Sequence, residues 1–197
     1  MKIFRFFILI CLLLPILSEA GDMRAATLIN DLKGVYKYRF MGGTYNGSET
    51  WQAEDIVEIV PFDDSHIYVR ASLEFGNGHL CGIWGIAEYE NDAFIYHEPE
   101  KLRQGDPSCT LKIYATKNEL VLTDIDSTNE NSTCRMHCGS RGSLTNYTIA
   151  RNSKRKIRYL DRLKASRQYL EAADAFKEKQ SLTLHSSGTA AKDAAAP

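Results

Sequence analysis

The stretch HIYVRASLEF, residues 66–75, alternates apolar side chains with more polar ones. One set of alternate positions is wholly apolar and consists of Ile67, Val69, Ala71, Leu73 and Phe75. The positions between them hold Tyr68, Arg70, Ser72 and Glu74. A period of two is typical of a β-strand with one buried face and one face in water. The stretch therefore predicts a half-buried strand.

Similar short segments, separated by turn residues, lie on both sides of this strand. Gly76-Asn77-Gly78 is typical of a hairpin connection, and Gly82 and Gly85 predict a bend or bulge in the following strand. The other seven predicted strands cover residues 35–40, 50–60, 80–89, 93–96, 109–116, 119–123 and 143–149. The short connections leave no room for crossover helices, so the sheet should be antiparallel.

The predicted fold is all-β, an eight-stranded antiparallel meander or small calycin-like barrel over residues 21–150. Closure into a barrel removes exposed strand edges, which favours it over an open sheet. A two-sheet sandwich is the alternative.

The N-terminus has the pattern of an export signal. Lys2 and Arg5 supply positive charge before an apolar run at residues 6–17, and small residues surround Ala20. This pattern predicts a signal peptide of residues 1–20, cut after Ala20. The run is shorter than the roughly 20 apolar residues of a membrane-spanning helix. We therefore expect a periplasmic or secreted chain without a transmembrane span.

Charge divides the rest of the chain. Residues 21–150 carry 11 Lys and Arg against 19 Asp and Glu, net −8, whereas residues 151–179 carry 10 against 4, net +6. The spacing of the large apolar residues in the second part predicts an amphipathic basic helix; they are Tyr159, Leu163, Leu170, Ala173 and Phe176. We expect this helix to dock on the acidic body or on another acidic surface, and we do not expect a nucleic-acid partner. Residues 180–197 have the composition of a disordered tail.

Four cysteines follow the predicted signal peptide, namely Cys81, Cys109, Cys134 and Cys138. Thiols of exported proteins are normally oxidised, and four cysteines allow three pairings. Cys81 and Cys109 each begin a predicted strand with inward-facing parity, and Cys134 and Cys138 are four positions apart in a loop. This arrangement favours the pairs Cys81–Cys109 and Cys134–Cys138.

Metal binding and catalysis are weaker interpretations of the same residues. His79 and His137 lie near cysteines and suggest a zinc site, but the spacing lacks the paired short motifs of structural zinc sites. A nucleophilic cysteine with His137 as its base is weaker still. Glu98 and Glu100 could serve as acid and base but are typical of a solvated acidic loop. No catalytic residue, metal or cofactor is predicted, and we do not expect an enzyme.

Three sequons begin at Asn46, Asn131 and Asn146. Such triplets accept glycans in a eukaryotic secretory pathway, and they also arise by chance in polar loops. The sequence alone supports either reading.

The segment CRMHCGSRGS, residues 134–143, follows strands that carry cysteines. In this respect the chain resembles small exported bacterial β proteins that are grouped with periplasmic lysozyme inhibitors. The resemblance implies an envelope protein that binds another protein or a cell-wall component without turning it over. Animal-type lysozymes are basic, so the acidic body would be steered towards them.

Two functions are compatible with these observations. The first is an exported binding module, of the lysozyme-inhibitor kind, with Ser140 and Arg141 as contact residues, because a disulfide-closed loop is ordered before it binds. The second is a carrier that holds a small apolar ligand inside the barrel, since an eight-stranded barrel either fills with its own side chains or holds one small ligand.

Overall fold

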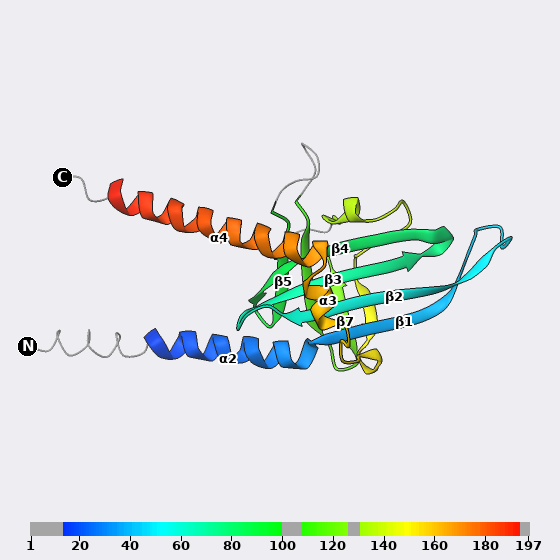
Figure 1. Cartoon of the computed structure of the whole chain (residues 1–197), viewed down its shortest axis with the longest axis horizontal. Helices are drawn as coiled ribbons and strands as arrows, with labels where there is room; N and C mark the ends of the chain where they lie inside the picture. The colour runs from blue at the N-terminus through cyan, green and yellow to red at the C-terminus, as the bar shows by residue number, and fades with distance from the viewer. Residues whose placement is uncertain (1–13, 100–107, 126–130, 194–197) are drawn as a thin grey trace, which may run out of the picture.

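The computed structural model describes residues 14–99, 108–125 and 131–193, and within them the predicted fold is confirmed. Eight antiparallel strands form one nearly closed, barrel-shaped sheet in the order β1 to β8, so the sandwich alternative is wrong (Figure 1). The strands are β1 (Gly34–Gly43), β2 (Thr50–Pro61), β3 (His66–Phe75), β4 (His79–Glu90), β5 (Ala93–His97), β6 (Thr110–Ala115), β7 (Glu119–Thr123) and β8 (Tyr147–Ala150).

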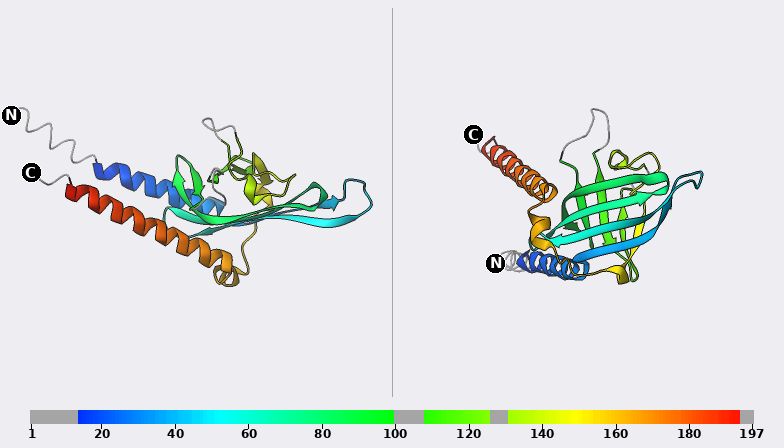
Figure 2. Two further views of the ribbon diagram at one scale, coloured as in Figure 1. Left: turned by 90° about the horizontal axis from the view of Figure 1, so that it is seen from above. Right: turned by 45° about the vertical axis from the view of Figure 1, so that its right-hand side comes forward.

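Helical segments connect and flank these strands. The longer helices are α2 (Leu14–Leu32) and α4 (Arg167–Asp193), with the short α3 (Leu160–Lys164) before α4. Single 3₁₀ turns occur at η1 (Gly76–Gly78), η2 (Arg135–His137) and η3 (Arg151–Ser153). Helices α2 and α4 both leave the sheet at the end opposite the β1–β2 hairpin (Figures 1 and 2).

The inner face of the sheet is filled by the protein's own side chains. The alternating apolar positions of β3 point inwards, where they pack in one cluster with side chains from all seven of the other strands. The largest fully buried side chains of this cluster include Tyr36, Ile59, Ile67, Leu73, Phe94, Leu111, Ile113 and Leu122.

Helix α2 closes one end of the barrel, which the sequence did not predict. Ala25, Ile29 and Leu32 are buried, and the last two belong to the interior cluster. The hydroxyl of Tyr36 donates to the carbonyl oxygen of Leu32 at 2.9 Å, and burial raises the pKa of Tyr36 to about 12. The helix runs through Ala20, and the part that follows this predicted cleavage site makes the closing contacts.

The basic arm docks on the outer face of the sheet, but it does so mainly through its apolar stripe and not through its positive face as predicted. Tyr169 lies over Tyr68 with ring centroids 4.8 Å apart, and Phe176 packs edge-on against Phe62 and His66. Tyr68 is fully buried, so the prediction of a wholly water-exposed outer face on β3 is wrong. Aromatic packing makes these contacts, while several basic side chains of the arm remain exposed: Lys156, Arg158, Arg162 and Lys164.

The boundaries of the arm also differ from the prediction of one helix ending near residue 179. A break at Ser166 separates α3 from α4, and the Ser166 hydroxyl accepts a hydrogen bond from the backbone N–H of Tyr169 at 3.3 Å. A serine in this position is a favourable helix N-cap. Helix α4 then continues to Asp193, where the sequence predicted a disordered tail from residue 180.

Two glycines of β4 give a matched test of barrel packing. A Cβ atom at Gly85 would overlap the buried Tyr96 ring, whereas one at Gly82 would meet no atom within 4 Å. We expect Gly85→Ala to lower the free energy of unfolding by about 2–3 kcal/mol and Gly82→Ala to change it by less than about 0.5 kcal/mol. Urea denaturation of both variants measures this difference, and equal stabilities would contradict the packing of Tyr96 over Gly85.

Candidate functional site

The disulfides join different cysteines from those predicted. Cys81 pairs with Cys138 and Cys109 pairs with Cys134, so the four cysteines were predicted correctly but the pairing was wrong. Strand β5 lies between β4 and β6 in the sheet, which separates Cys81 from Cys109. All four sulfurs are in disulfides, and the described residues hold no group of side chains arranged to bind a metal ion.

Backbone contacts explain the observed pairing. Cys138 forms an antiparallel bridge with Cys81, and the N–H of Gly139 donates to the carbonyl oxygen of Leu80 at 2.8 Å. The segment after η2 therefore lies alongside the start of β4. Two disulfides fit an oxidising, extracellular location. No helix among the described residues is long and apolar enough to cross a membrane.

Three loops meet at the end of the barrel to which η1 belongs. We call the side chains at this end the tip surface, which consists of the exposed Tyr45, Leu80, Met136, Ser140 and Arg141 and the partly buried His79. The fractional exposure is 85% for Tyr45, 58% for Leu80 and 38% for Met136. These apolar side chains come from the β1–β2 loop, from β4 and from η2, and none of them was predicted as a site residue.

Ser140 and Arg141, the two predicted binding residues, are exposed and belong to this surface. The guanidinium of Arg141 lies 5.4 Å from the centroid of the Tyr45 ring, a cation–π arrangement. Arg135 donates to the carbonyl oxygen of Ser140 at 3.4 Å. The loop is therefore held by contacts with its neighbours, although the predicted Cys134–Cys138 closure is wrong.

Close packing holds the loop at both of its ends. Cys138 ties one end to β4, and Gly142 is buried at the other end. A Cβ atom on Gly142 would lie 2.6 Å from the Cys81 sulfur, so the chain approaches the disulfide more closely than any side chain permits. The exposed residues between them rest on a rigid base.

Two buried carboxylates fix η2 to the barrel. Glu98 accepts hydrogen bonds from the His137 ring and from the backbone N–H of Cys109, each at 3.0 Å. Asp124, only 3% exposed, accepts from the backbone N–H of Cys134 at 2.9 Å and from Thr145 at 2.8 Å. Glu98 therefore accepts hydrogen bonds within the fold, and the prediction that it lies in a solvated loop is wrong. Glu100, the other acidic residue of that prediction, lies outside the described residues.

A third buried carboxylate lies below the tip. Asp55 accepts hydrogen bonds from the backbone N–H of Glu74 at 2.7 Å and from the Tyr147 hydroxyl at 2.8 Å. Burial raises the pKa of the Asp55 carboxyl above its ordinary value, and burial together with this hydrogen bond raises the pKa of Tyr147. These groups link β2, β3 and β8 beneath the exposed loops.

Ser140 and His79 form the arrangement nearest to a catalytic pair. The Ser140 hydroxyl lies 3.5 Å from Nδ1 and 3.4 Å from Nε2 of His79. Being almost equidistant from both nitrogens, it is not aligned with the lone pair of either. Among the described residues no carboxylate bonds to His79 to orient its ring, as a serine–histidine mechanism requires. The geometry suits a polar contact surface better than nucleophilic chemistry.

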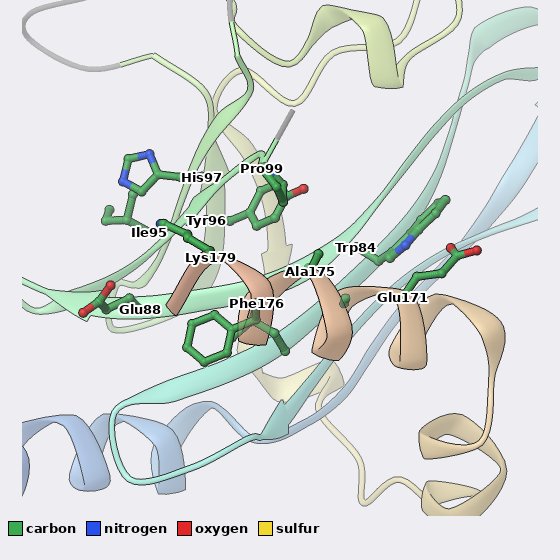
Figure 3. Close-up of a pocket in the computed structure, with 13 residues that line it drawn as sticks. Trp84, Glu88, Ile95, Tyr96, His97, Pro99, Glu171, Ala175, Phe176 and Lys179 are labelled. Carbon is green, nitrogen blue, oxygen red and sulfur yellow. The ribbon is translucent and has the colours of Figure 1, made fainter. Parts of the chain in front are cut away.

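A second candidate site lies between α4 and the outer face of β4 and β5 (Figure 3). Helix α4 diverges from the sheet here and leaves a groove of about 680 Å³ next to a smaller hollow of about 200 Å³. Both are lined by Trp84, Tyr96, His97, Pro99, Ala175 and Lys179. The volume of the groove falls within the range of small-molecule binding sites. The groove was not predicted, because its two walls are distant in sequence.

Comparison of this chain with protein-family models, with curated proteins and with solved structures finds no match in any of the three.

Proposed function

We propose that this protein is an exported binding module that recognises another protein through the tip surface. The observation that carries the proposal is the set of exposed side chains at this end, in which Arg141 lies over Tyr45 and the loop of residues 138–142 is bonded to β4 beside Leu80 and the Cys81–Cys138 disulfide. Tyrosine and arginine are enriched among the residues that dominate protein interfaces. Because Cys138 and Gly142 hold the loop, little conformational entropy is lost when it binds.

We further propose a basic partner, of which an animal-type lysozyme is the first to test. The resemblance of residues 134–143 implies the lysozyme-inhibitor kind of activity. Residues 21–150 carry a net charge of −8, which the docked arm reduces to −2 over residues 21–179, and the remaining negative charge would favour encounter with a basic protein. The exposed Arg141 would then contribute to recognition at close range, and a periplasmic location would follow.

Substitution at the tip tests the contact surface. We expect Arg141→Ala and Tyr45→Ala each to weaken binding by about 30-fold or more, the effect of removing an interface residue worth about 2 kcal/mol. Both side chains are solvent-exposed, so the stability of the fold should change little. Isothermal titration calorimetry of the oxidised chain with an animal-type lysozyme, and inhibition of that enzyme, are the measurements.

The control is Lys117→Ala, which removes an exposed charge from the turn between β6 and β7. This turn lies near Arg151, at the barrel end that α2 closes. The control should bind as the wild type does. If both variants bind lysozyme as tightly as the wild type does, the tip surface is not the contact surface. If the wild type does not bind lysozyme, lysozyme is excluded as the partner.

A second candidate function follows from the groove beside α4. If the chain carries a small apolar ligand, the filled barrel directs that ligand to the groove, against the indole of Trp84. Titration with a fluorescent apolar dye tests this, with Trp84→Ala as the variant. Dye binding that is unchanged in this variant would exclude the groove as its site.

A further inference from the structure

Strand β1 has one paired edge and one open edge. It pairs along its whole length with β2, from Gly34 opposite Ile59 to Gly43 opposite Thr50. On its other side the described chain pairs with it only at Val35, which exchanges backbone hydrogen bonds with Arg155 at 2.9 and 2.8 Å. Strand β8, the neighbour that would complete the barrel, has four residues against ten in β1. Most of this edge of β1 therefore has no strand partner among the described residues.

Alternation along the strand shows which backbone groups point out of this edge. Val35 directs both its N–H and its C=O towards Arg155, whereas Thr44 directs its N–H towards Glu49 on the β2 side. Successive residues of a strand point to opposite neighbours. The N–H and C=O groups of Lys37, Arg39 and Met41 consequently face the open edge. We call residues 37–43 of β1 the open edge.

The side chains of the open edge present an apolar face and a basic face. Tyr38 and Phe40 stack with ring centroids 5.4 Å apart, and Tyr38 is 56% exposed. On the opposite face Lys37 and Arg39 both bond to Glu54, at 2.8 and 2.6 Å. One carboxylate against two cations leaves a net positive charge. The strand also has no proline, which commonly protects exposed edges.

We infer that the open edge binds an extended segment of a partner protein, which adds to the sheet as a further strand. Main-chain hydrogen bonds supply affinity in this mode of recognition, and alternate side chains supply specificity. The partner segment would alternate apolar residues, packed on Tyr38 and Phe40, with acidic residues opposite Lys37 and Arg39. The inference goes beyond the proposed function, because it rests on backbone groups outside the tip surface.

A second copy of this chain fits the edge less well. Antiparallel pairing of two β1 strands centred on Tyr38 places Lys37 opposite Arg39 of the other copy, and pairing centred on Arg39 places the two arginines opposite each other. Like charges directly opposite one another destabilise a strand pair. Charge therefore favours an acidic segment from a different protein.

The test uses a capped, fluorescein-labelled heptapeptide of alternating glutamate and valine, titrated into the full oxidised chain by fluorescence polarisation. The informative pair of variants is Arg39→Ala and Arg39→Pro. Both lose the side-chain charge, but only proline also removes the outward N–H, and proline is tolerated on strand edges. We expect Arg39→Pro to bind the peptide about tenfold more weakly than Arg39→Ala does.

A second probe avoids any effect of proline on folding. The same peptide, N-methylated at the amides that would donate to β1, should lose binding to the wild-type chain. Equal affinity of the two Arg39 variants and of the two peptides, or no saturable binding up to about 1 mM, would overturn the inference.

Two further outcomes separate the alternatives. Self-association of the wild-type chain that Arg39→Pro abolishes would assign the edge to a second copy and overturn the inferred partner. The tip variant Leu80→Ser should bind the peptide as the wild type does, so failure of the tip proposal would leave this result intact. Loss of peptide binding in Leu80→Ser would show that the peptide binds at the tip and overturn the inference.

Discussion

Replacement of both Cys81 and Cys138 by alanine is expected to lower the free energy of unfolding by about 4 kcal/mol, according to the chain-entropy estimate for a loop of this length. The two cysteines are 57 residues apart in sequence. The loss is large against the roughly 5–15 kcal/mol that stabilises a typical domain. Removal of this bond should also release Ser140 and Arg141 from β4 and weaken partner binding. Guanidinium denaturation and binding titration of the same variant measure the two effects.

The other disulfide is the matched comparison. Cys109 and Cys134 are 25 residues apart, so their replacement should cost somewhat less, about 3–4 kcal/mol. It leaves the link between β4 and the tip loop intact. Of the two variants, the one without Cys109 and Cys134 should therefore retain more partner affinity. An equal loss of affinity in both would contradict a specific role of the Cys81–Cys138 bond at the tip.

Substitution of Arg70 by methionine is expected to lower the free energy of unfolding by about 3–5 kcal/mol, because it leaves a buried carboxylate without its cation. Glu58 is 2% exposed and pairs with the Arg70 guanidinium through two hydrogen bonds. Arg70 also donates to Gln168 of α4 at 2.9 Å, and the Tyr159 hydroxyl donates to Glu58. The arm should accordingly become easier to detach from the sheet.

Arg70→Lys and Tyr159→Phe refine this prediction. Lysine keeps the charge but not the planar fork that contacts Glu58 twice. The free energy of unfolding of Arg70→Lys should therefore lie between that of the wild type and that of Arg70→Met. Tyr159→Phe removes one hydrogen bond and should cost about 1 kcal/mol. Thermal unfolding and limited proteolysis of the arm measure these effects. An Arg70→Met variant as stable as the wild type would contradict the assignment of this pair to the interface between the arm and the sheet.

The strands were predictable because a period of two is a local property of the chain. Residues 66–75 were predicted with the bounds that the structure shows, and the antiparallel order followed from short connections. The burial of Tyr68 was not predictable in this way, since it depends on α4, about one hundred residues further along. The role of Ala25, Ile29 and Leu32 in closing the barrel also depends on tertiary contacts. In the sequence these residues follow an apolar run that predicts a signal peptide, and nothing local indicates that they pack against the barrel.

The last strand shows how local chemistry can shorten a predicted element. The prediction began at residue 143, but β8 begins at Tyr147. Asn146 has a φ of 51°, in the left-handed region, and its side chain accepts a hydrogen bond from Thr123 at 3.1 Å. Asparagine tolerates this conformation better than most residues. The turn before β8 is therefore a specific feature of Asn146, which strand periodicity does not reveal.

The candidate site was only partly predictable. Ser140 and Arg141 were identified because they follow two cysteines, although the disulfide pairing was wrong. Pairing depends on which strands are adjacent, and β5 separates the two cysteines that parity alone would join. Tyr45, Leu80 and Met136 could have been suspected as large apolar residues in or beside predicted turns. Their assembly into one surface requires the fold.

Hydrogen exchange tests the tip surface most directly. It is measured on the chain alone and on the chain bound to the protein partner that the binding titrations identify. The amides of residues 44–47, 77–81 and 135–142 should become protected on binding, while those of α4 beside the groove remain unchanged. Protection confined to α4, β4 and β5 at the groove, with no change in the tip segments, would contradict the account.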